Sequence, residues 1–563
     1  MIRSAIRPLL ALALMLPLLG AEAASAKPAD RVLVVVGAEP GRGADAARLV
    51  QRVGGRVEAR LAIIHGFTAR VPAGAIGPLR RAGAVRTVVR DARLTLSSTP
   101  TPDGAIDPPP EEIPTDQPAD EVARDVISDA ATDAAAGSSL EPDPVAAGED
   151  TVPALSDTVT DPTAPIEPAA DDGPARARAS IDLIRAASGA DASGLTGAGV
   201  DVALIDSGVL GVAALDGPGK LVRGPDFSED AYDPDLRGLD AFGHGSHMAG
   251  VIAGNDAETG YRGMAPGARV VSVKVAGADG ITSLVRVLMA LDWVRRNRAS
   301  NGLHIRVLNL SFGVDARRSY VREPLAYAAE QLWNRGIAVV AAAGNQADGT
   351  GRLDLPAADP FVIAVAATDT NGTAATDDDA IATFSSRDAV RPPDVAAPGT
   401  NVVSLRVPGS TLDTEFPAAR IGDAFFRGSG TSQATAVVSG LVAQLLEARP
   451  DLTPNQIKAL LKAGAVDLAD PVSADGAGRV DLARSLALGT PSLASAAQHW
   501  EPAVMDLWAL WSDLRDEAYG TAPGVGTGEN GWTGRRWSGE QWSGRRWSGR
   551  RWSGSDWSGD GSS

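Results

Sequence analysis

The chain has no cysteine among its 563 residues. This absence excludes disulfide bonds, catalysis by a thiol and metal sites built from thiolates. It says nothing against export, because a large apolar core can stabilise a secreted domain without disulfides. Hydrophobic residues make up 44% of the chain, which is enough for one core domain of about 300 residues with smaller modules beside it.

Long hydrophobic runs are scarce as well. The clearest one covers residues 8–19, follows two arginines and precedes small residues at 21–26 that suit a signal peptidase. It is too short to span a bilayer, which takes about 20 apolar residues, and no later segment is longer. We therefore predict that residues 1–26 are a signal peptide and that the product is secreted and extracellular.

One stretch of small residues leads into a long apolar segment. Residues 428–435 are Gly-Ser-Gly-Thr-Ser-Gln-Ala-Thr, and an almost wholly apolar run continues from there to Leu446. A helix that is apolar on all sides has to be buried, so it would hold Ser432 rigidly in its first turn. Backbone N–H groups and the positive end of the helix dipole favour an anion there. A serine at this place can also be a simple helix cap, so partners elsewhere decide between the two interpretations.

An acid and a histidine upstream supply those partners. Asp206 ends an apolar strand over residues 200–205, and ligands bind at the carboxyl ends of strands in open α/β sheets. His244 lies among glycines in a chain that has only five histidines. An acid, a histidine and a serine in this order match one of the known orders of the Asp-His-Ser catalytic triad.

Through these three motifs the chain resembles the subtilisin-like serine proteases, or subtilases, over roughly residues 181–486. The resemblance implies that Ser432 is the nucleophile, that His244 is its general base and later the acid, and that Asp206 fixes the histidine tautomer. His247 matches the family's second histidine, which does not take part in the chemistry. The implied function is that of a serine-type endopeptidase, which hydrolyses peptide bonds of proteins through an acyl-enzyme intermediate.

The resemblance also assigns an oxyanion hole. Asn345 matches the side-chain amide that works there with the backbone N–H of Ser432, although a residue that follows Gly344 can also be a plain turn residue. One such donor is worth about 3 kcal/mol, a value that comes from subtilisin and is borrowed here rather than obtained for this chain.

Two segments resemble the walls of the pocket for the residue before the scissile bond, and the segment around Gly280 resembles the edge that pairs with an extended substrate. The wall residues are Ser311, Phe312, Gly313, Ala342, Ala343 and Gly344. No fixed acid is evident at these walls, so we predict a broad specificity with a preference for apolar residues.

Calcium is common in subtilases, but no site for it can be assigned here. Residues 255–256 and 377–379 are rich in oxygen ligands, yet neither has a defensible ligand spacing. We expect these segments to be solvated loops and assign no metal and no cofactor, so that a structural calcium ion stays open. Ala436 and Val437 also depart from the Pro and His that the family usually has after its nucleophile.

The predicted catalytic domain, residues 179–487, alternates strands and helices. Compact apolar runs such as 269–275 and 305–310 suit parallel strands that are covered on both faces, and residues 282–298 and 324–334 have helical spacing. This alternation predicts an α/β fold with a doubly wound parallel sheet.

A smaller module precedes it. Residues 30–96 show a β-α-β-β-α-β order, which is the ferredoxin-like α+β arrangement. The segment from Ile63 to Pro72 resembles the core of the inhibitory propeptide of subtilases. The resemblance implies that this module binds its own protease in cis, assists folding, leaves its C-terminal tail in the cleft and is removed by self-processing. No catalytic role is expected for His65.

Residues 97–178 form an acidic linker. Between residues 101 and 174 there are nineteen acids and one base, so this segment alone accounts for the formal net charge of −18. A segment that is rich in Pro, Ala and acids cannot bury enough apolar area to offset its ordering entropy, so we predict disorder. The site of maturation stays open between the region after Leu96 and the segment Arg176–Arg178.

The C-terminal part carries most of the tryptophan. Residues 488–520 suit a helical segment with three tryptophans, and residues 521–563 repeat a Trp-Ser/Thr-Gly unit every five residues, interleaved with arginine pairs. Such a tail suits contact with a glycan, a cell wall or another anionic surface, and the alternative is a disordered tail without a specific role. We expect no nucleic-acid partner. A surface-binding protein without protease activity is the other hypothesis for the whole chain, and the complete set Asp206, His244, Asn345 and Ser432 favours the protease.

Overall fold

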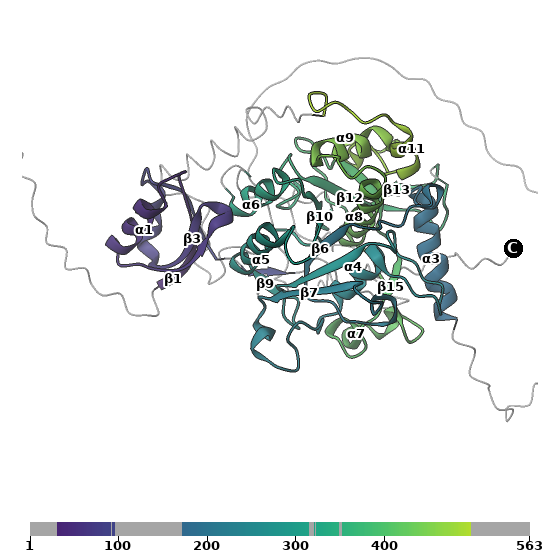
Figure 1. Cartoon of the computed structure of the whole chain (residues 1–563), viewed down its shortest axis with the longest axis horizontal. Helices are drawn as coiled ribbons and strands as arrows, with labels where there is room; N and C mark the ends of the chain where they lie inside the picture. The colour runs from purple at the N-terminus through teal and green to yellow at the C-terminus, as the bar shows by residue number, and fades with distance from the viewer. Residues whose placement is uncertain are drawn as a thin grey trace, which may run out of the picture. The chain divides into compact units, whose positions relative to one another are not determined.

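The computed structural model describes two parts of the chain, the N-terminal module (residues 31–95) and the main domain (residues 172–496), which belong to one compact unit (Figure 1). The predicted signal peptide, nearly all of the acidic linker and the tryptophan repeats lie outside the described residues. The described residues are 31–91, 93–95, 172–314, 320, 323–347, 352–375 and 377–496.

The N-terminal module has the predicted β-α-β-β-α-β order. Its strands form one antiparallel sheet in the order β2-β3-β1-β4. The elements are β1 (Arg31–Ala38), α1 (Gly43–Arg52), β2 (Arg56–Leu61), β3 (Gly66–Pro72), α2 (Ile76–Arg80) and β4 (Val85–Arg90), with a short 3-10 turn at Ala62–Ile64.

The two faces of this sheet belong to different hydrophobic cores. Side chains alternate along a strand, so Val34 and Val36 pack in the module's own core while Val35 points the other way. Val35 joins the core of the main domain together with Ile63 and Ile64. The module therefore covers only one face of its sheet by itself, and the main domain covers the other.

The main domain is built on a largely parallel sheet with the strand order β13-β12-β11-β10-β6-β8-β7, in which β14 also pairs with β12. Every pair in it is parallel except β12 with β13. Its strands are β6 (Asp201–Asp206), β7 (Leu221–Asp226), β8 (Arg269–Lys274), β10 (Ile305–Leu310), β11 (Ala338–Ala342), β12 (Ile363–Asp369), β13 (Ala380–Ile381) and β14 (Val395–Pro398).

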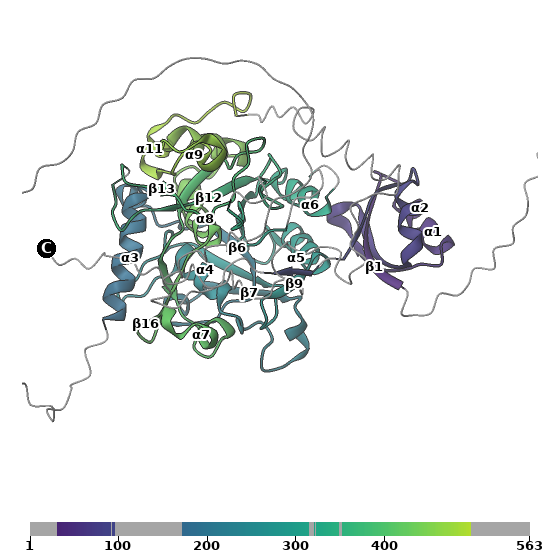
Figure 2. The same ribbon diagram turned by 180° about the vertical axis from the view of Figure 1, so that it is seen from behind.

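Helices cover both faces of this sheet, which confirms the predicted α/β fold. Helix α8 packs against β10, β11 and β12 and against α4, whereas α5 and α6 pack on each other and contact β6 and β11. Figures 1 and 2 show α5 and α6 together on one side of the strands. The helices are α3 (Gly173–Ala187), α4 (His244–Ala253), α5 (Leu284–Asn297), α6 (Pro324–Trp333), α7 (Thr411–Glu415), α8 (Thr431–Ala448), α9 (Pro454–Gly464), α10 (Val472–Asp475) and α11 (Leu482–Ala487).

Two small sheets complete the described structure. Strands β15 (Val402–Leu405), β17 (Phe425–Gly428) and β16 (Arg420–Ile421) form an antiparallel sheet, and β5 (Arg93–Thr95) pairs with β9 (Ile281–Ser283). Within the described part of the chain, no helix has the length and apolar character that crossing a bilayer requires.

Some predicted boundaries are wrong. Helix α3 begins at Gly173, inside the predicted linker, because Ala177, Ile181 and Ile184 are buried at helical spacing. The helix predicted over 282–298 starts with β9, which pairs with the N-terminal module. Residues 488–496 contain no helix, and the rest of the predicted tryptophan-bearing helix lies outside the described residues.

Candidate active site

Asp206 and His244 form a buried hydrogen-bonded pair. Asp206 is the last residue of β6, and His244 is the first residue of α4. The imidazole Nδ1 lies 2.7 Å from Asp206 Oδ1, and the two residues are 0% and 1% exposed. A carboxylate accepts hydrogen bonds, so Nδ1 carries the proton and Nε2 is left as the basic nitrogen.

Glycine makes this close approach geometrically feasible. A methyl group added at Gly245 would lie 2.0 Å from the carbonyl oxygen of Gly208 and 3.2 Å from Asp206 Oδ1. Gly243 just before the histidine has φ of 105°, a conformation that side chains with a Cβ rarely adopt. These two glycines explain why the motif around the histidine consists of small residues.

Asp240 links the acid to the histidine. Its Oδ1 accepts hydrogen bonds from Ser207 Oγ at 2.8 Å and from the Gly243 N–H at 2.7 Å. Its Oδ2 accepts from the Ser246 N–H at 2.7 Å, in the first turn of α4. Because Ser207 follows Asp206 directly, this one carboxylate ties the end of β6 to the start of α4.

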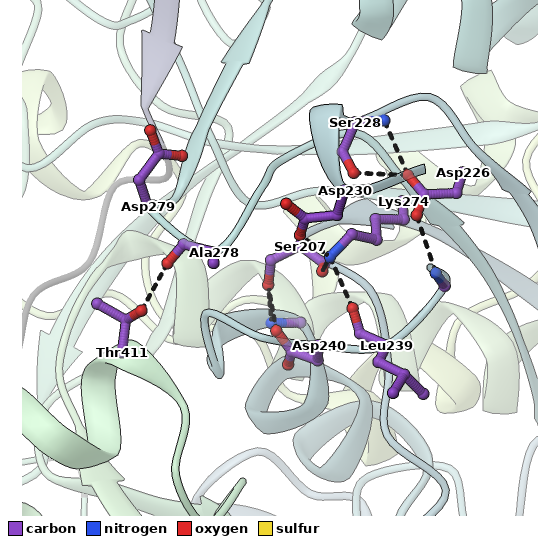
Figure 3. Close-up of polar contacts among 12 residues, drawn as sticks. Ser207, Asp226, Ser228, Asp230, Leu239, Asp240, Lys274, Ala278, Asp279 and Thr411 are labelled. Carbon is purple, nitrogen blue, oxygen red and sulfur yellow. Dashed lines mark hydrogen bonds and ion pairs between the residues drawn. The ribbon is translucent and has the colours of Figure 1, made fainter. Parts of the chain in front are cut away.

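A buried lysine, Lys274, also holds the end of β6 through hydrogen bonds. Lys274 is 1% exposed, and its Nζ donates to the carbonyl oxygens of Ser207 at 3.0 Å and Leu239 at 2.6 Å. Its charge is paired with Asp230 Oδ2 at 2.8 Å. Figure 3 shows Lys274 between these three groups, with Asp240 beside Ser207. We interpret this cluster as a frame that holds the loop before His244.

Ser432 lies in the first turn of α8, as predicted, and its hydroxyl bonds to the backbone of the segment after β10. Ser432 Oγ donates a hydrogen bond to the carbonyl oxygen of Ser311 at 3.0 Å. His244 Nε2 is buried and has no hydrogen-bond partner among the described residues. Helices α4 and α8 pack against each other, so the two side chains start from neighbouring elements. A serine–histidine hydrogen bond requires that the Ser432 hydroxyl hydrogen leave the Ser311 carbonyl oxygen.

The Asn345 side-chain amide and the backbone nitrogen of Ser432 lie close to the same position beside Gly430. A methyl group added at Gly430 would lie 3.2 Å from Asn345 Nδ2 and 3.6 Å from Ser432 N. The Asn345 amide has a defined direction, because its Oδ1 accepts from Thr431 N at 2.8 Å and from Thr431 Oγ1 at 2.9 Å. The donor end therefore faces the Gly430 side, where it can meet a negative oxygen.

The predicted pocket walls follow strands β10 and β11. Ser311 comes directly after β10, and its Oγ donates to the carbonyl oxygen of Ser432 at 3.2 Å. Asn309 donates to Ser311 Oγ at 2.7 Å and accepts from Ser439 Oγ at 2.9 Å, which joins the wall to α8. Phe312 is fully buried and belongs to the main core. The opposite wall, Ala342, Ala343 and Gly344, leads from β11 to Asn345.

The predicted absence of an acid at these walls is wrong. A methyl group added at Gly313 would lie 2.5 Å from Asp354 Cβ, and one added at Gly344 would lie 2.6 Å from Asp354 Oδ2. Asp354 is 6% exposed, and its Oδ1 accepts from Gln346 Nε2 at 2.9 Å. No local motif marks Asp354, because it comes to the walls only through the path of the chain between β11 and β12.

The segment at Gly280 leads into strand β9, whose edge is already paired with another strand. Gly280 has φ of 70° and immediately precedes β9. Strand β9 pairs with β5 of the N-terminal module in an antiparallel register that sets Leu94 opposite Thr282. The segment predicted to add to an extended peptide thus already pairs with an extended segment of the same chain.

The second histidine, His247, is buried beside the backbone of β17. Burial, with a smaller contribution from nearby His244, lowers the pKa of His247 to about 3, so it stays neutral at physiological pH. His247 Nε2 lies 3.1 Å from the carbonyl oxygen of Phe426. The described residues contain no group of three or more His, Asp or Glu side chains that could hold a metal ion.

Comparisons with known proteins match this chain to the subtilase family and to two bacterial serine proteases. The model of the Subtilase family, Peptidase_S8, matches residues 197–479. Serine protease AprX of Bacillus subtilis (strain 168) is 37% identical over 279 residues, which are 48% of this chain and 62% of that protein. Subtilisin Savinase of Lederbergia lenta is 34% identical over 277 residues, which are 49% of this chain and 86% of that protein. The match therefore spans about three fifths of AprX and most of Savinase.

A solved structure is similar in fold. The crystal structure of fervidolysin from Fervidobacterium pennivorans, described as a keratinolytic enzyme related to subtilisin, superposes with a TM-score of 0.54 at 22% sequence identity. The superposition covers 82% of this chain and 62% of fervidolysin.

The Asp240 bridge predicts a change in the reactivity of Ser432. In Asp240→Asn one oxygen is replaced by an NH2 group, which cannot accept a hydrogen bond from an N–H, so the bridge between β6 and α4 loses an acceptor. We expect the rate constant for modification of Ser432 by a serine-directed phosphonofluoridate to fall about tenfold or more. The matched control is Asp235→Asn, an exposed acid on the same loop, which should react like the wild type. An unchanged rate in Asp240→Asn would contradict the positioning role.

Proposed function

The chain belongs to the subtilase family, and on this premise we propose that it is a secreted serine endopeptidase that hydrolyses peptide bonds of proteins. The observation that carries the proposal is the buried 2.7 Å contact between Asp206 and His244 beside the helix that bears Ser432. Export rests on the signal peptide predicted for residues 1–26.

The reaction begins at Ser432. Its Oγ attacks the carbonyl carbon of the substrate while His244 Nε2 takes the hydroxyl proton. The imidazolium that forms is stabilised by Asp206, which remains ionised. The carbonyl π electrons move to oxygen, and the resulting oxyanion accepts hydrogen bonds from Ser432 N–H and Asn345 Nδ2.

Collapse of this intermediate gives the acyl-enzyme. The C–N bond breaks, and His244 gives its proton to the leaving amine. Water then attacks the ester in the same way, His244 accepts its proton, and Ser432 recovers its hydrogen as the acid product leaves. In the resting structure Ser432 donates to the Ser311 carbonyl, so each cycle starts with rotation of the hydroxyl toward His244.

We propose that the N-terminal module is an inhibitory propeptide that acts in cis. Support comes from β5, which pairs with β9 where substrate is expected to pair, and from the Val285 N–H, which donates to Asp91 Oδ1 at 3.0 Å. Tyr327 of α6 adds a second contact. The Arg86 guanidinium carbon lies 3.6 Å from the centre of the Tyr327 ring. The centres of the His65 and Tyr327 rings are 6.2 Å apart, in an edge-to-face arrangement.

The position of α3 limits where the chain can be cleaved during self-processing. Arg176 and Arg178 lie in α3, where Ala177 between them is fully buried, and proteolysis there would require that the helix unwind. We therefore propose that cleavage falls after β5 and before α3.

For the residue before the scissile bond we propose Lys or Arg in place of the apolar residues expected from the sequence. Support comes from the position of the Asp354 carboxylate against both glycine walls. A carboxylate in a buried site attracts a cation more strongly than it would in water. An apolar substrate side chain would instead remove water from the carboxylate without pairing its charge, which costs free energy. The side-chain amide of Gln346, which donates a hydrogen bond to Asp354, adds a further polar group beside the pocket.

Ser432→Ala tests the proposed activity. We expect the variant to accumulate as the unprocessed precursor and to hydrolyse peptides several orders of magnitude more slowly, because it lacks the proposed nucleophile. The wild type should bind one phosphonofluoridate per chain and lose residues 31–95, as mass spectrometry would detect. Ser495→Ala, on an exposed turn, is the matched control. Equal labelling of wild type and Ser432→Ala would refute the assignment of the nucleophile.

Asp354→Asn tests the proposed specificity, because it removes the charge and keeps the shape. We expect kcat/KM for peptides with Arg before the scissile bond, divided by kcat/KM for the Phe analogues, to fall about tenfold or more in the variant. If the wild type cleaves the Phe peptide faster and the variant leaves this ratio unchanged, the cationic preference is wrong.

A further inference from the structure

Gln433, the residue after the nucleophile, is an unusual buried amide. Its side chain is 0% exposed, and neither Oε1 nor Nε2 has a hydrogen-bond partner among the described residues. Buried polar groups are nearly always paired, and an unpaired one costs about 1–3 kcal/mol. An apolar side chain of the same length would avoid this cost. The amide therefore calls for a partner, and the part of the chain that the structure describes provides none.

The position of this amide indicates which partner that is. A methyl group added at Gly430 would lie 2.8 Å from Gln433 Oε1, 3.2 Å from Asn345 Nδ2 and 3.6 Å from Ser432 N. The side-chain amide of Gln433 thus borders the same point as the two proposed oxyanion donors. It comes from the first turn of α8, where the helix dipole also favours negative charge.

We propose that Gln433 is a third hydrogen-bond donor to the oxyanion of the tetrahedral intermediate. This inference rests on the proposed function. The two ends of an amide have nearly the same size, and no described residue hydrogen-bonds to either end of Gln433. The group can therefore turn end over end and point Nε2–H toward the negative oxygen. Gln433 forms no covalent bond and transfers no proton.

The proposed contact acts mainly on the transition state. The substrate carbonyl oxygen is neutral in the ground state, whereas the oxyanion carries a full negative charge and binds an N–H donor much more strongly. Loss of the donor should therefore lower kcat and leave KM nearly unchanged. Thr431 already holds the Asn345 amide in its direction, whereas the Gln433 amide has to turn before it can donate. We therefore expect Gln433 to contribute less to kcat than Asn345.

The experiment compares the wild type with Gln433→Met and Gln433→Glu in the full chain. Met keeps the length and removes both polar ends, while Glu keeps the shape and, when ionised, only accepts hydrogen bonds. We expect kcat to fall about tenfold in Gln433→Met and further in Gln433→Glu, with KM of Gln433→Met within about twofold of the wild type. The Tm of Gln433→Met should not fall, since an unpaired buried amide is removed.

A transition-state readout separates catalysis from structure. A peptide aldehyde forms a tetrahedral adduct with the nucleophile, so its affinity should fall by the same factor as kcat/KM in Gln433→Met, while a non-covalent peptide inhibitor should bind unchanged. A wild-type kcat and aldehyde affinity in Gln433→Met would overturn this inference and leave the protease intact. A lower Tm with parallel changes in both inhibitors would also overturn it. A wild type without peptide hydrolysis would instead refute the proposed function.

Discussion

The structure depends first on the hydrogen bond between His244 and Asp206, in which a carboxylate and an imidazole are held 2.7 Å apart with almost no exposure to water. Burial of two titratable groups is costly unless their geometry is fixed. Asp240, Ser207 and Lys274 supply this fixation through buried hydrogen bonds, and Gly245 allows the backbones to approach. The geometry of the pair is therefore a property of a whole polar frame rather than of two residues.

A single feature of the fold explains why distant segments meet. Asp206 ends β6, Ser311 follows β10 and Asn345 lies just beyond β11, so all three lie past the carboxyl ends of neighbouring parallel strands. Helix α8 crosses the same strands and brings Ser432 to this edge. Parallel strands that share one direction thus gather the acid, the pocket wall and the amide without any local sequence relation between them.

Much of this arrangement could be predicted from local patterns. Apolar runs that alternate with helical periodicity predicted the parallel sheet, and glycine-flanked Asp206, His244 and Ser432 predicted the site. Asp354 could not be found in this way, because its place between Gly313 and Gly344 depends on tertiary packing. Two further features are visible only when the surrounding side chains are in place: the Gln433 amide has no partner among the described residues, and the Ser432 hydroxyl donates to Ser311. The start of α3 could have been found from the spacing of Ala177, Ile181 and Ile184, but the acidic composition before it masked the signal.

We propose that Asp206, His244 and Ser432 act as one unit beside an oxyanion hole. A crystal structure of the chain after reaction with a phosphonofluoridate tests this claim most directly. The prediction is an adduct on Ser432 Oγ, with the phosphonyl oxygen in hydrogen-bond contact with Ser432 N and Asn345 Nδ2, and with His244 Nε2 within hydrogen-bond reach of Oγ. An adduct on another residue, or an imidazole that stays out of reach of Ser432 Oγ, would contradict it.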